Sequence, residues 1–475
     1  MIPFTEDSKV QKRRWIILSI VCMCTFMSCL DGSIVNIAMP DIQRELHVDT
    51  NQVQWIVSIY LIVCCSTLVL FGKLGDSLGK IKILKLGNLL FVAGSLMCAL
   101  SGNLLFLLIA RVLQGIGASM PMATNSGIIT EIFKKEERGR ALSLIGVFVS
   151  LGLIVGPGIG GILLSLFSWQ AIFMINVPIG IVLFLVGQFV LPADRSKTHE
   201  KIDWASFVFW SLTIVFFFGT LFTLQDSGWR TPLLVPLVVA FVVGIGGFIA
   251  LELKEKQQLI DLSMFKNRNF SHGLFAGVLL FTALFFNNLI FPFYLQETNH
   301  ITEMHAGILM MIFPMSMVVF APISGMLTDK LNPRALTQFG LALVIAGFSM
   351  YCIFGLKISI PLFVVAALLQ GCGNAFFSTP NNTIVMSSVE PQDYGIASSL
   401  LALSRNLGST IGSVVATSAL FGAMSLFLGH STKTYIEDRP DVFVNGMRVA
   451  FIIAAAISIA ALVLVSTVNV KVRKK

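Results

Sequence analysis

Apolar segments about twenty residues long recur along the whole chain and constrain its fold more than any other feature. About 20 apolar residues in a helix cross a hydrocarbon core of about 30 Å. Fourteen such runs are present, at approximately 15–39, 52–72, 82–101, 104–129, 141–165, 171–191, 204–224, 232–251, 270–296, 305–327, 335–356, 360–386, 396–424 and 448–470. Only 12% of the residues are charged, about half the share found in soluble domains. The sequence therefore predicts an all-α integral membrane protein with fourteen transmembrane helices.

The basic residues predict the orientation of these helices. The net charge is +8, but lysine and arginine lie in alternate short gaps between apolar runs and in both tails rather than in one patch. This is the pattern of a positive-inside membrane protein and does not favour nucleic-acid binding. With an even number of helices, both termini are expected on the cytoplasmic side of the cell (inner) membrane. The first run is too long for a signal peptide and carries Asp31, so we expect it to be retained.

An internal repeat divides the chain. Leu113–Gly117 (LQGIG) recurs 256 residues later as Leu369–Gly373 (LQGCG). The same offset relates Asn125 to Asn381, Gly139 to Gly395, Ala141 to Ala397, Gly152 to Gly408 and Gly156 to Gly412, while Gly72 and Asp76 match Gly325 and Asp329 at an offset of 253. Such a parallel repeat is typical of two transporter halves related by an axis along the membrane normal. We expect six-helix bundles in 1–200 and 257–475, with two inserted helices in 201–256.

Two glycine-rich motifs lie at Gly72–Lys82 and Gly152–Gly161, and they resemble motifs of the major facilitator superfamily. Gly72–Lys82 (GKLGDSLGKIK) is similar to its loop motif, in which Gly72 and Gly79 permit a tight turn and Asp76 can pair with a cation or cap a helix. Asp329 occupies the matching position in the second half. Gly152–Gly161 (GLIVGPGIGG) resembles the antiporter motif of exporters. Its small residues, Gly152, Gly156 and Gly160, lie four apart and allow close helix packing, and Pro157 bends the helix.

Further motifs lie at Leu30–Pro40, Trp169–Gly180, Leu259–Phe265 and Tyr294–Gln296. They resemble those of the fourteen-helix drug:proton antiporters of this superfamily, so the resemblance extends over essentially the whole chain. It implies a major facilitator fold of two six-helix bundles plus two additional helices. It also implies proton-coupled efflux of small amphipathic, often cationic, compounds by alternating access, and a role in drug resistance.

Two charged residues within apolar runs are the candidates for proton coupling. Asp31 lies roughly 24 Å from the cytoplasmic end of its helix, and Arg111 roughly 10 Å from the outer face, so both occupy similar depths. Charges persist inside a membrane only where they serve a purpose, because burying each one is costly. Burial favours a neutral carboxyl group, whereas a nearby cation favours the ionised form. We therefore expect Asp31 to pair with Arg111 and to carry the proton, with a structural ion pair as the alternative.

Polar residues within other apolar runs are candidates for lining a substrate cavity. They are Asn36, Asn125, Asn287, Asn288, Asn381, Asn382 and Arg405. Asparagines in membrane helices also join neighbouring helices by hydrogen bonds, and this alternative stays open.

Three other functions are alternatives to drug export. Export of one physiological solute, such as a lipid, a peptide or an amino-acid-like metabolite, is the first alternative. An intramembrane enzyme is less favoured because the six histidines are scattered and the eight cysteines lie inside apolar runs, without a metal-site spacing. The absence of a phosphate-loop motif argues against a self-contained ATP pump. The expected partners are amphipathic small molecules, protons and lipid. No cofactor or metal is expected, and the transporter is expected to act as a monomer.

Overall fold

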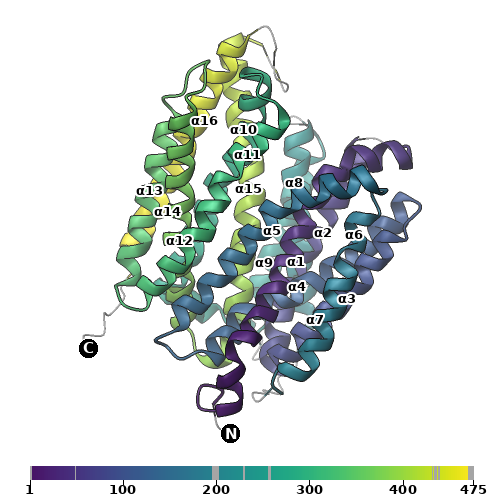
Figure 1. Ribbon diagram of the computed structural model, residues 1–475, viewed down its shortest axis with the longest axis vertical. Helices are drawn as coiled ribbons and strands as arrows, with labels where there is room; N and C mark the ends of the chain where they lie inside the picture. Colours follow the sequence, from purple (N-terminus) through teal and green to yellow (C-terminus); the bar gives the residue numbers. More distant parts are fainter. Residues whose placement is uncertain are drawn as a thin grey trace. The chain divides into compact units, whose positions relative to one another are not determined.

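The structure is a computed structural model that describes residues 3–48, 50–194, 203–227, 231–254, 258–430, 432, 436 and 439–468. Regular structure in these residues is entirely helical (Figure 1). The α-helices are α1 (Ser8–Leu46), α2 (Thr50–Leu78), α3 (Lys80–Ala99), α4 (Leu104–Ile132), α5 (Arg138–Leu166), α6 (Ala171–Met174), α7 (Asn176–Val190), α8 (Trp204–Ser227), α9 (Leu234–Lys254), α10 (Arg268–Pro292), α11 (Glu303–Met310), α12 (Ile312–Thr328), α13 (Pro333–Tyr351), α14 (Ile360–Ser387), α15 (Tyr394–Leu428) and α16 (Pro440–Ser466). Shorter helical turns are η1 (Leu262–Lys266), η2 (Phe293–Thr298) and η3 (Pro391–Asp393).

Several helices begin at residues whose side chains satisfy the free backbone amides of the first turn. Asp7 accepts from the amides of Lys9 and Val10 at the start of α1, and Asn103 accepts from the amide of Phe106 at the start of α4. Such capping matters because the first amides of a helix have no partner within it.

Twelve helical segments in the described residues are long and apolar enough to cross a membrane, whereas fourteen were predicted. The prediction of an all-helical, multi-pass membrane protein is confirmed, but the count of fourteen is not. The two runs outside the twelve, 141–165 and 335–356, do form helices, α5 and α13. Helix α13 has only 19 residues, and Arg334 and Gln338 interrupt its apolar sequence. In α5, five side chains between 150 and 158 lie outside the described part of the chain.

Contacts group the helices into two compact units. The first unit comprises Met1–Phe218, Val239–Met264 and Met386–Leu403, and the second comprises Gly219–Val238, Phe265–Val385 and Ser404–Lys475. Helix α15 contributes its first turns to the first unit and its remainder to the second. This grouping follows contacts rather than chain order, and the division into 1–200, 201–256 and 257–475 stays a prediction.

Glycines allow the helices of the first unit to approach closely. A Cβ atom at Gly94 of α3 would lie 2.6 Å from the backbone nitrogen of Gln114 in α4, too close for any side chain. At Gly117 of α4, a Cβ atom would collide with the backbone of Phe91. These contacts fix the position of α4, the helix that carries Arg111.

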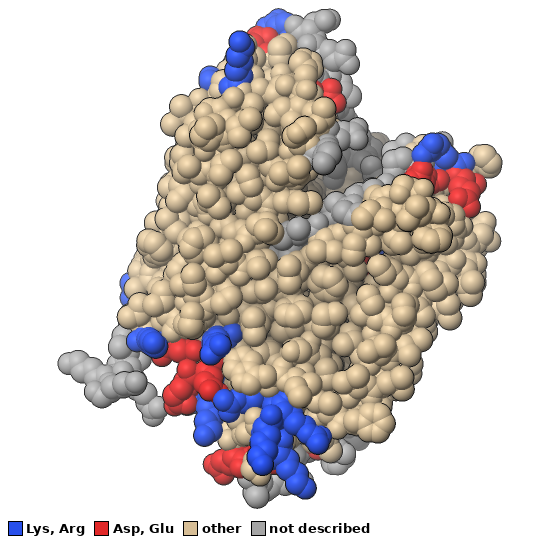
Figure 2. Space-filling view, in the orientation of Figure 1, with Lys and Arg blue, Asp and Glu red and all other residues tan. Residues whose placement is uncertain are grey.

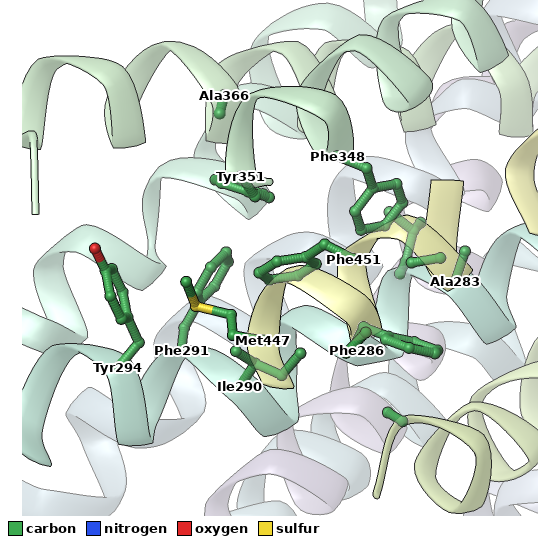
Figure 3. Close-up of a cluster of buried hydrophobic side chains, with 14 of the residues drawn as sticks. Ala283, Phe286, Ile290, Phe291, Tyr294, Phe348, Tyr351, Ala366, Met447 and Phe451 are labelled. Atoms are coloured by element: carbon green, nitrogen blue, oxygen red, sulfur yellow. The ribbon is translucent and has the colours of Figure 1, made fainter. Parts of the chain in front are cut away.

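Aromatic side chains form the core of the second unit. Phe291 of α10 lies 4.8 Å from Tyr351 of α13 and 4.9 Å from Phe363 of α14, measured between ring centroids. Tyr351 in turn lies 5.1 Å from Phe451 of α16. Figure 3 shows Phe286, Ile290, Phe291 and Tyr294 along one helix beside Tyr351, Phe348 and Phe451.

Charged side chains gather at the ends of the helices. Figure 2 shows lysine, arginine, aspartate and glutamate concentrated at both ends of the visible face, with uncharged residues covering most of the middle. Many exposed residues on the helices are large and apolar, including Phe189, Val235 and Leu426. Such a surface is stable in lipid rather than in water.

Candidate functional site

The structure brings Asp31 and Arg111 into a fully buried ion pair. Arg111 Nη1 lies 2.6 Å from Asp31 Oδ2, and neither residue is accessible to solvent. Asp31 lies on α1 and Arg111 on α4, so the contact joins two helices. The predicted pairing is confirmed, while a role of the pair in proton coupling stays a prediction.

Two amide side chains complete the contacts of the carboxylate. Gln114 Nε2 donates to Asp31 Oδ1 at 2.8 Å, and Asn176 Nδ2 donates to the same oxygen at 3.1 Å. Gln114 lies one turn after Arg111 on α4, and Asn176 is the first residue of α7. Gln114 also donates to Ser95 Oγ of α3 at 2.8 Å. The carboxylate therefore holds three helices together through hydrogen bonds.

The guanidinium of Arg111 is fixed on several sides. Its Nε donates to the carbonyl of Ile56 in α2 at 2.9 Å, and Nη1 also donates to Gln114 Oε1 at 2.7 Å. The ring of Tyr60 lies 4.3 Å from the guanidinium carbon and that of Phe173 5.7 Å away. Lysine could not reproduce this geometry because its ammonium is a compact point charge without a planar fork.

Three polar atoms at this site have no hydrogen-bond partner among the described residues. They are Arg111 Nη2, the hydroxyl of Tyr60 and Asn176 Oδ1. Unpaired buried polar groups are costly, and those in native structures call for an explanation such as bound water or a catalytic role. Here they provide a donor and acceptors next to an ionisable carboxyl group. Proton uptake at Asp31 stays a prediction.

A second buried charge cluster surrounds Asp76 at the end of α2. Lys80 Nζ lies 2.7 Å from Asp76 Oδ1 and 2.7 Å from Glu131 Oε1 of α4. The backbone amides of Gly395 and Ile396 donate to the two Asp76 oxygens at 2.8 and 3.0 Å. Asp76 thus binds the N-terminus of α15, where the helix dipole favours negative charge.

The sequence predicted a loop at Gly72–Lys82, but most of this segment is helical. Helix α2 continues to Leu78 and α3 begins at Lys80, so Gly79 alone makes the turn, with φ of 110°. A Cβ atom at Gly79 would also collide with Asp194, whose two carboxylate oxygens accept from the amides of Ile81 and Lys82 at 2.9 Å each. Only glycine fits this position without strain.

The α5 glycines lie against α1 beside residues on both sides of Asp31 in the sequence. A Cβ atom at Gly152 would lie 2.9 Å from the carbonyl oxygen of Phe26, and one at Gly160 would lie 2.8 Å from Ile34 Cγ1. At Gly156 it would overlap Ser33 Oγ, which itself donates to the Gly152 carbonyl at 3.1 Å. The motif therefore forms a close α1–α5 contact. The side chain of Pro157 lies outside the described residues.

The other polar residues predicted to line a cavity lie in several different environments. Asn125 is buried and donates to Thr25 Oγ1, and Asn381 is buried and donates to the Gly273 carbonyl at 3.1 Å. Both contacts join helices, which is the alternative that the sequence left open.

The remaining predicted positions are less enclosed or take part in other contacts. Asn287 is buried and donates to Gln370, Asn288 is exposed, and Asn382 is half-buried. Arg405 of α15 and Asp329, at the C-terminus of α12, are also half-buried. The side chain of Asn36 lies outside the described residues. A surface pocket of about 370 Å³ is lined by other residues, among them Asp41, Glu45 and Trp169.

Sequence reasoning missed Gln114 and Asn176 as partners of Asp31. Each carried a signal: Gln114 belongs to the repeated LQG segment, and Asn176 lies within the motif Trp169–Gly180. Both are neutral residues whose importance depends on the neighbours that the fold supplies. Among the described residues, no group of three histidine, cysteine, aspartate or glutamate side chains is placed to hold a metal ion.

Comparison with known proteins identifies relatives of this chain. The family model of the Major Facilitator Superfamily matches residues 21–251 and 273–475. The riboflavin transporter RibZ of Clostridioides difficile is 35% identical over 458 residues, which cover 95% of this chain and 97% of that protein.

More distant relatives include drug transporters. The multidrug resistance protein Stp of Mycobacterium tuberculosis is 28% identical, with coverage of 87% of this chain and 77% of that protein. The multidrug transporter protein MdtP of Bacillus subtilis is 25% identical, with coverage of 92% and 80%. The human organic anion transporter MFSD10 has a similar fold, with a TM-score of 0.66 at 13% identity over 96% of this chain and 99% of that one.

Proposed function

Because this chain belongs to the major facilitator superfamily of membrane transporters, we propose that it is a proton-coupled exporter of small amphipathic, often cationic, compounds. It is a transporter rather than an enzyme, and its relatives include multidrug resistance proteins. Within the superfamily we assign it to the fourteen-helix drug:proton antiporters. The motifs Leu30–Pro40 and Gly152–Gly161 support this assignment.

The observation that carries the proposal is the buried contact between Asp31 and Arg111, made at 2.6 Å with both residues inaccessible. In the proton-loaded state, Asp31 is neutral and Arg111 retains Gln114 and the Ile56 carbonyl as acceptors. When a cationic substrate arrives, the carboxyl releases its proton and regains its ion pair. Exchange of one proton for one monovalent cation moves no net charge, so the difference in proton concentration across the membrane, rather than the membrane potential, drives uphill efflux.

Alternating access requires contacts that can break and re-form at the helix ends. Asp76 is suited to this role because it holds the N-terminus of α15 through two amides. The close α1–α5 contact at Gly156 couples movement of α5 to the helix that bears Asp31. The transporter works in the cell membrane as a monomer, with both termini cytoplasmic and with the proton as its only coupling ion and no cofactor.

Proton release from purified protein tests this proposal. Wild-type protein in weakly buffered detergent solution should release protons when ethidium, a permanent cation, is added. Ethidium should also leave proteoliposomes against its gradient when a pH difference is imposed. Ethidium transport at the same rate with and without the pH difference would contradict proton coupling.

A second candidate function is the transport of riboflavin. It is favoured by the 35% identity to a riboflavin transporter that extends over 95% of this chain. This is a specific form of the single-solute alternative. Uptake or efflux of radiolabelled riboflavin by cells that overproduce the protein, compared with deletion cells, decides between the two candidates.

A further inference from the structure

The second unit contains an uncharged counterpart of the Asp31 contact. In the first unit, Gln114 donates to Asp31 at 2.8 Å. In the second unit, Asn287 Nδ2 donates to Gln370 Oε1 at 2.6 Å. Asn287 follows Asp31 by 256 residues, and Gln370 follows Gln114 by the same number. The internal repeat therefore places the same kind of contact between α10 and α14 as between α1 and α4.

Both charges of the first contact are missing from the second. The counterpart of Arg111 at the same offset is Ala367, which is buried and lies one turn before Gln370. Because the carboxylate and its cation are both absent, neither charge is left buried without a partner. The second contact therefore cannot exchange a proton as a carboxyl group does, and it can recognise a ligand only by hydrogen bonds.

The amide pair has one free donor and one free acceptor. Asn287 Oδ1 and Gln370 Nε2 have no partner among the described residues, although Gln370 is fully buried and Asn287 is 8% exposed. If both amides are turned over, the same complement of one donor and one acceptor remains. Unsatisfied buried amide groups are destabilising, so this pair is poised for a ligand that supplies both missing partners.

Aromatic side chains of the same two helices pack together near the pair. Phe291 and Phe363 meet edge to face, with ring centroids 4.9 Å apart. The adjacent residue Asn288 is exposed although it lies within the span Arg268–Thr298. Polar side chains at such depths face protein interiors or water-filled cavities rather than lipid. Because Asn287 is itself 8% exposed and Gln370 is fully buried, a solute would reach the pair through Asn287.

We propose that Asn287 and Gln370 form a binding subsite for an uncharged solute group with an adjacent hydrogen-bond donor and acceptor. Cyclic imides, lactams and primary carboxamides have this pattern, in which an N–H lies beside a C=O. The N–H would donate to Asn287 Oδ1 and the C=O would accept from Gln370 Nε2. This inference rests on the proposed function. Asp31 binds the proton, and the amide pair binds a polar group of the solute.

A matched pair of fluorescent compounds tests the subsite in the full-length protein in detergent. The imide 1,8-naphthalimide presents the N–H beside two carbonyls, and its N-methyl derivative lacks the donor. Wild-type protein should bind the N–H compound about tenfold more tightly, which is the effect of one well-formed hydrogen bond. The double variant Asn287→Leu/Gln370→Leu should bind both compounds equally. Replacing both partners avoids leaving either amide unpaired, so this variant is expected to fold.

Asn374→Ala is the matched control for this measurement. Asn374 is a buried amide one turn after Gln370, and both of its polar groups are satisfied, by Met317 Sδ and Ser378 Oγ. It should keep the tenfold preference. Equal affinities in the wild type, or a preference that survives in the double variant, would overturn the inference and leave the pair as a helix contact. Ethidium-driven proton release by the wild type is read separately, so failure of the proposed function is distinguishable from failure of the subsite.

Discussion

Asp76 accepts a hydrogen bond of 2.8 Å from the backbone amide of Gly395, which lies 319 residues further along the chain. The two helices approach closely at this point, because a Cβ atom at Gly72 would lie 2.8 Å from the Gly395 carbonyl oxygen. A single carboxylate thus ties the end of α2 to the start of α15. This tie needs both the charge of Asp76 and the absence of a side chain at Gly395.

The change Asp76→Ala should weaken this tie and lower transport. The N-terminus of α15 would lose both acceptors, and Lys80 would keep only Glu131. Loss of a charged hydrogen-bond acceptor from a buried site costs about 1–3 kcal/mol. Thermal unfolding in detergent and ethidium efflux measure the two effects. Glu136→Gln, at an exposed acidic residue, is the control and should match the wild type. Unchanged efflux in Asp76→Ala would mean that the tie is dispensable.

Asp31→Asn should abolish substrate-driven proton release while the protein still folds. The amide keeps the shape of the carboxyl group but cannot carry a proton, and it relieves the desolvation of the charge. Asp31→Glu retains the carboxyl group one methylene further out and should function partially. A pH electrode in weakly buffered solution records the release on adding ethidium.

Asp41→Asn is the control for this measurement. It changes a partly exposed carboxylate near the end of the same helix and should release protons normally. If Asp31→Asn releases protons with unchanged stoichiometry, the carrier is another group and Asp31 is structural.

Neutralising both members of the ion pair should be less harmful than neutralising Arg111 alone. Arg111→Met leaves Asp31 charged in a site with no solvent access, and breaking a buried pair in this way costs about 3–5 kcal/mol. Adding Asp31→Asn removes that unpaired charge and should recover most of the loss. A double-mutant cycle on thermal unfolding, with equal amounts of membrane-extracted protein, measures the coupling. Strictly additive effects would show that the two charges do not stabilise one another in the folded protein.

Gly156→Leu should lower both stability and transport, whereas Gly161→Leu on the same helix should do neither. The first introduces bulk where a Cβ atom already overlaps Ser33 Oγ, and the second adds a side chain where no atom lies within 4 Å. Overpacking of a close helix contact costs about 1–3 kcal/mol. Efflux assays combined with quantification of protein in the membrane separate transport from expression. Equal behaviour of the two variants would argue against a specific α1–α5 contact.

The sequence by itself determined the class of this protein and one central contact. Long apolar runs specify membrane helices because lipid offers no hydrogen bonds to the backbone, so each span must satisfy its own amides and carbonyls. Because burying a charge in a membrane is costly, Asp31 and Arg111 stood out as candidates for function. The rise of a helix per residue predicted that the two lie at similar depths. Their ion pair in the structure agrees with that prediction. Fourteen spans were predicted, whereas twelve helical segments of the described residues are long and apolar enough to cross a membrane. Helix α13, which carries Arg334 and Gln338, is not among the twelve.

Only the tertiary structure decided which neutral residues complete the sites. Gln114 and Asn176 bind Asp31 because α4 and α7 converge on α1, and no local pattern records that convergence. The tie between Asp76 and Gly395 likewise depends on helices that are distant in sequence. Apolar and small residues specify which segments enter the membrane, but many helix arrangements bury them equally well. The choice among those arrangements comes from close packing and from hydrogen bonds between helices, which exist only once the chain has folded.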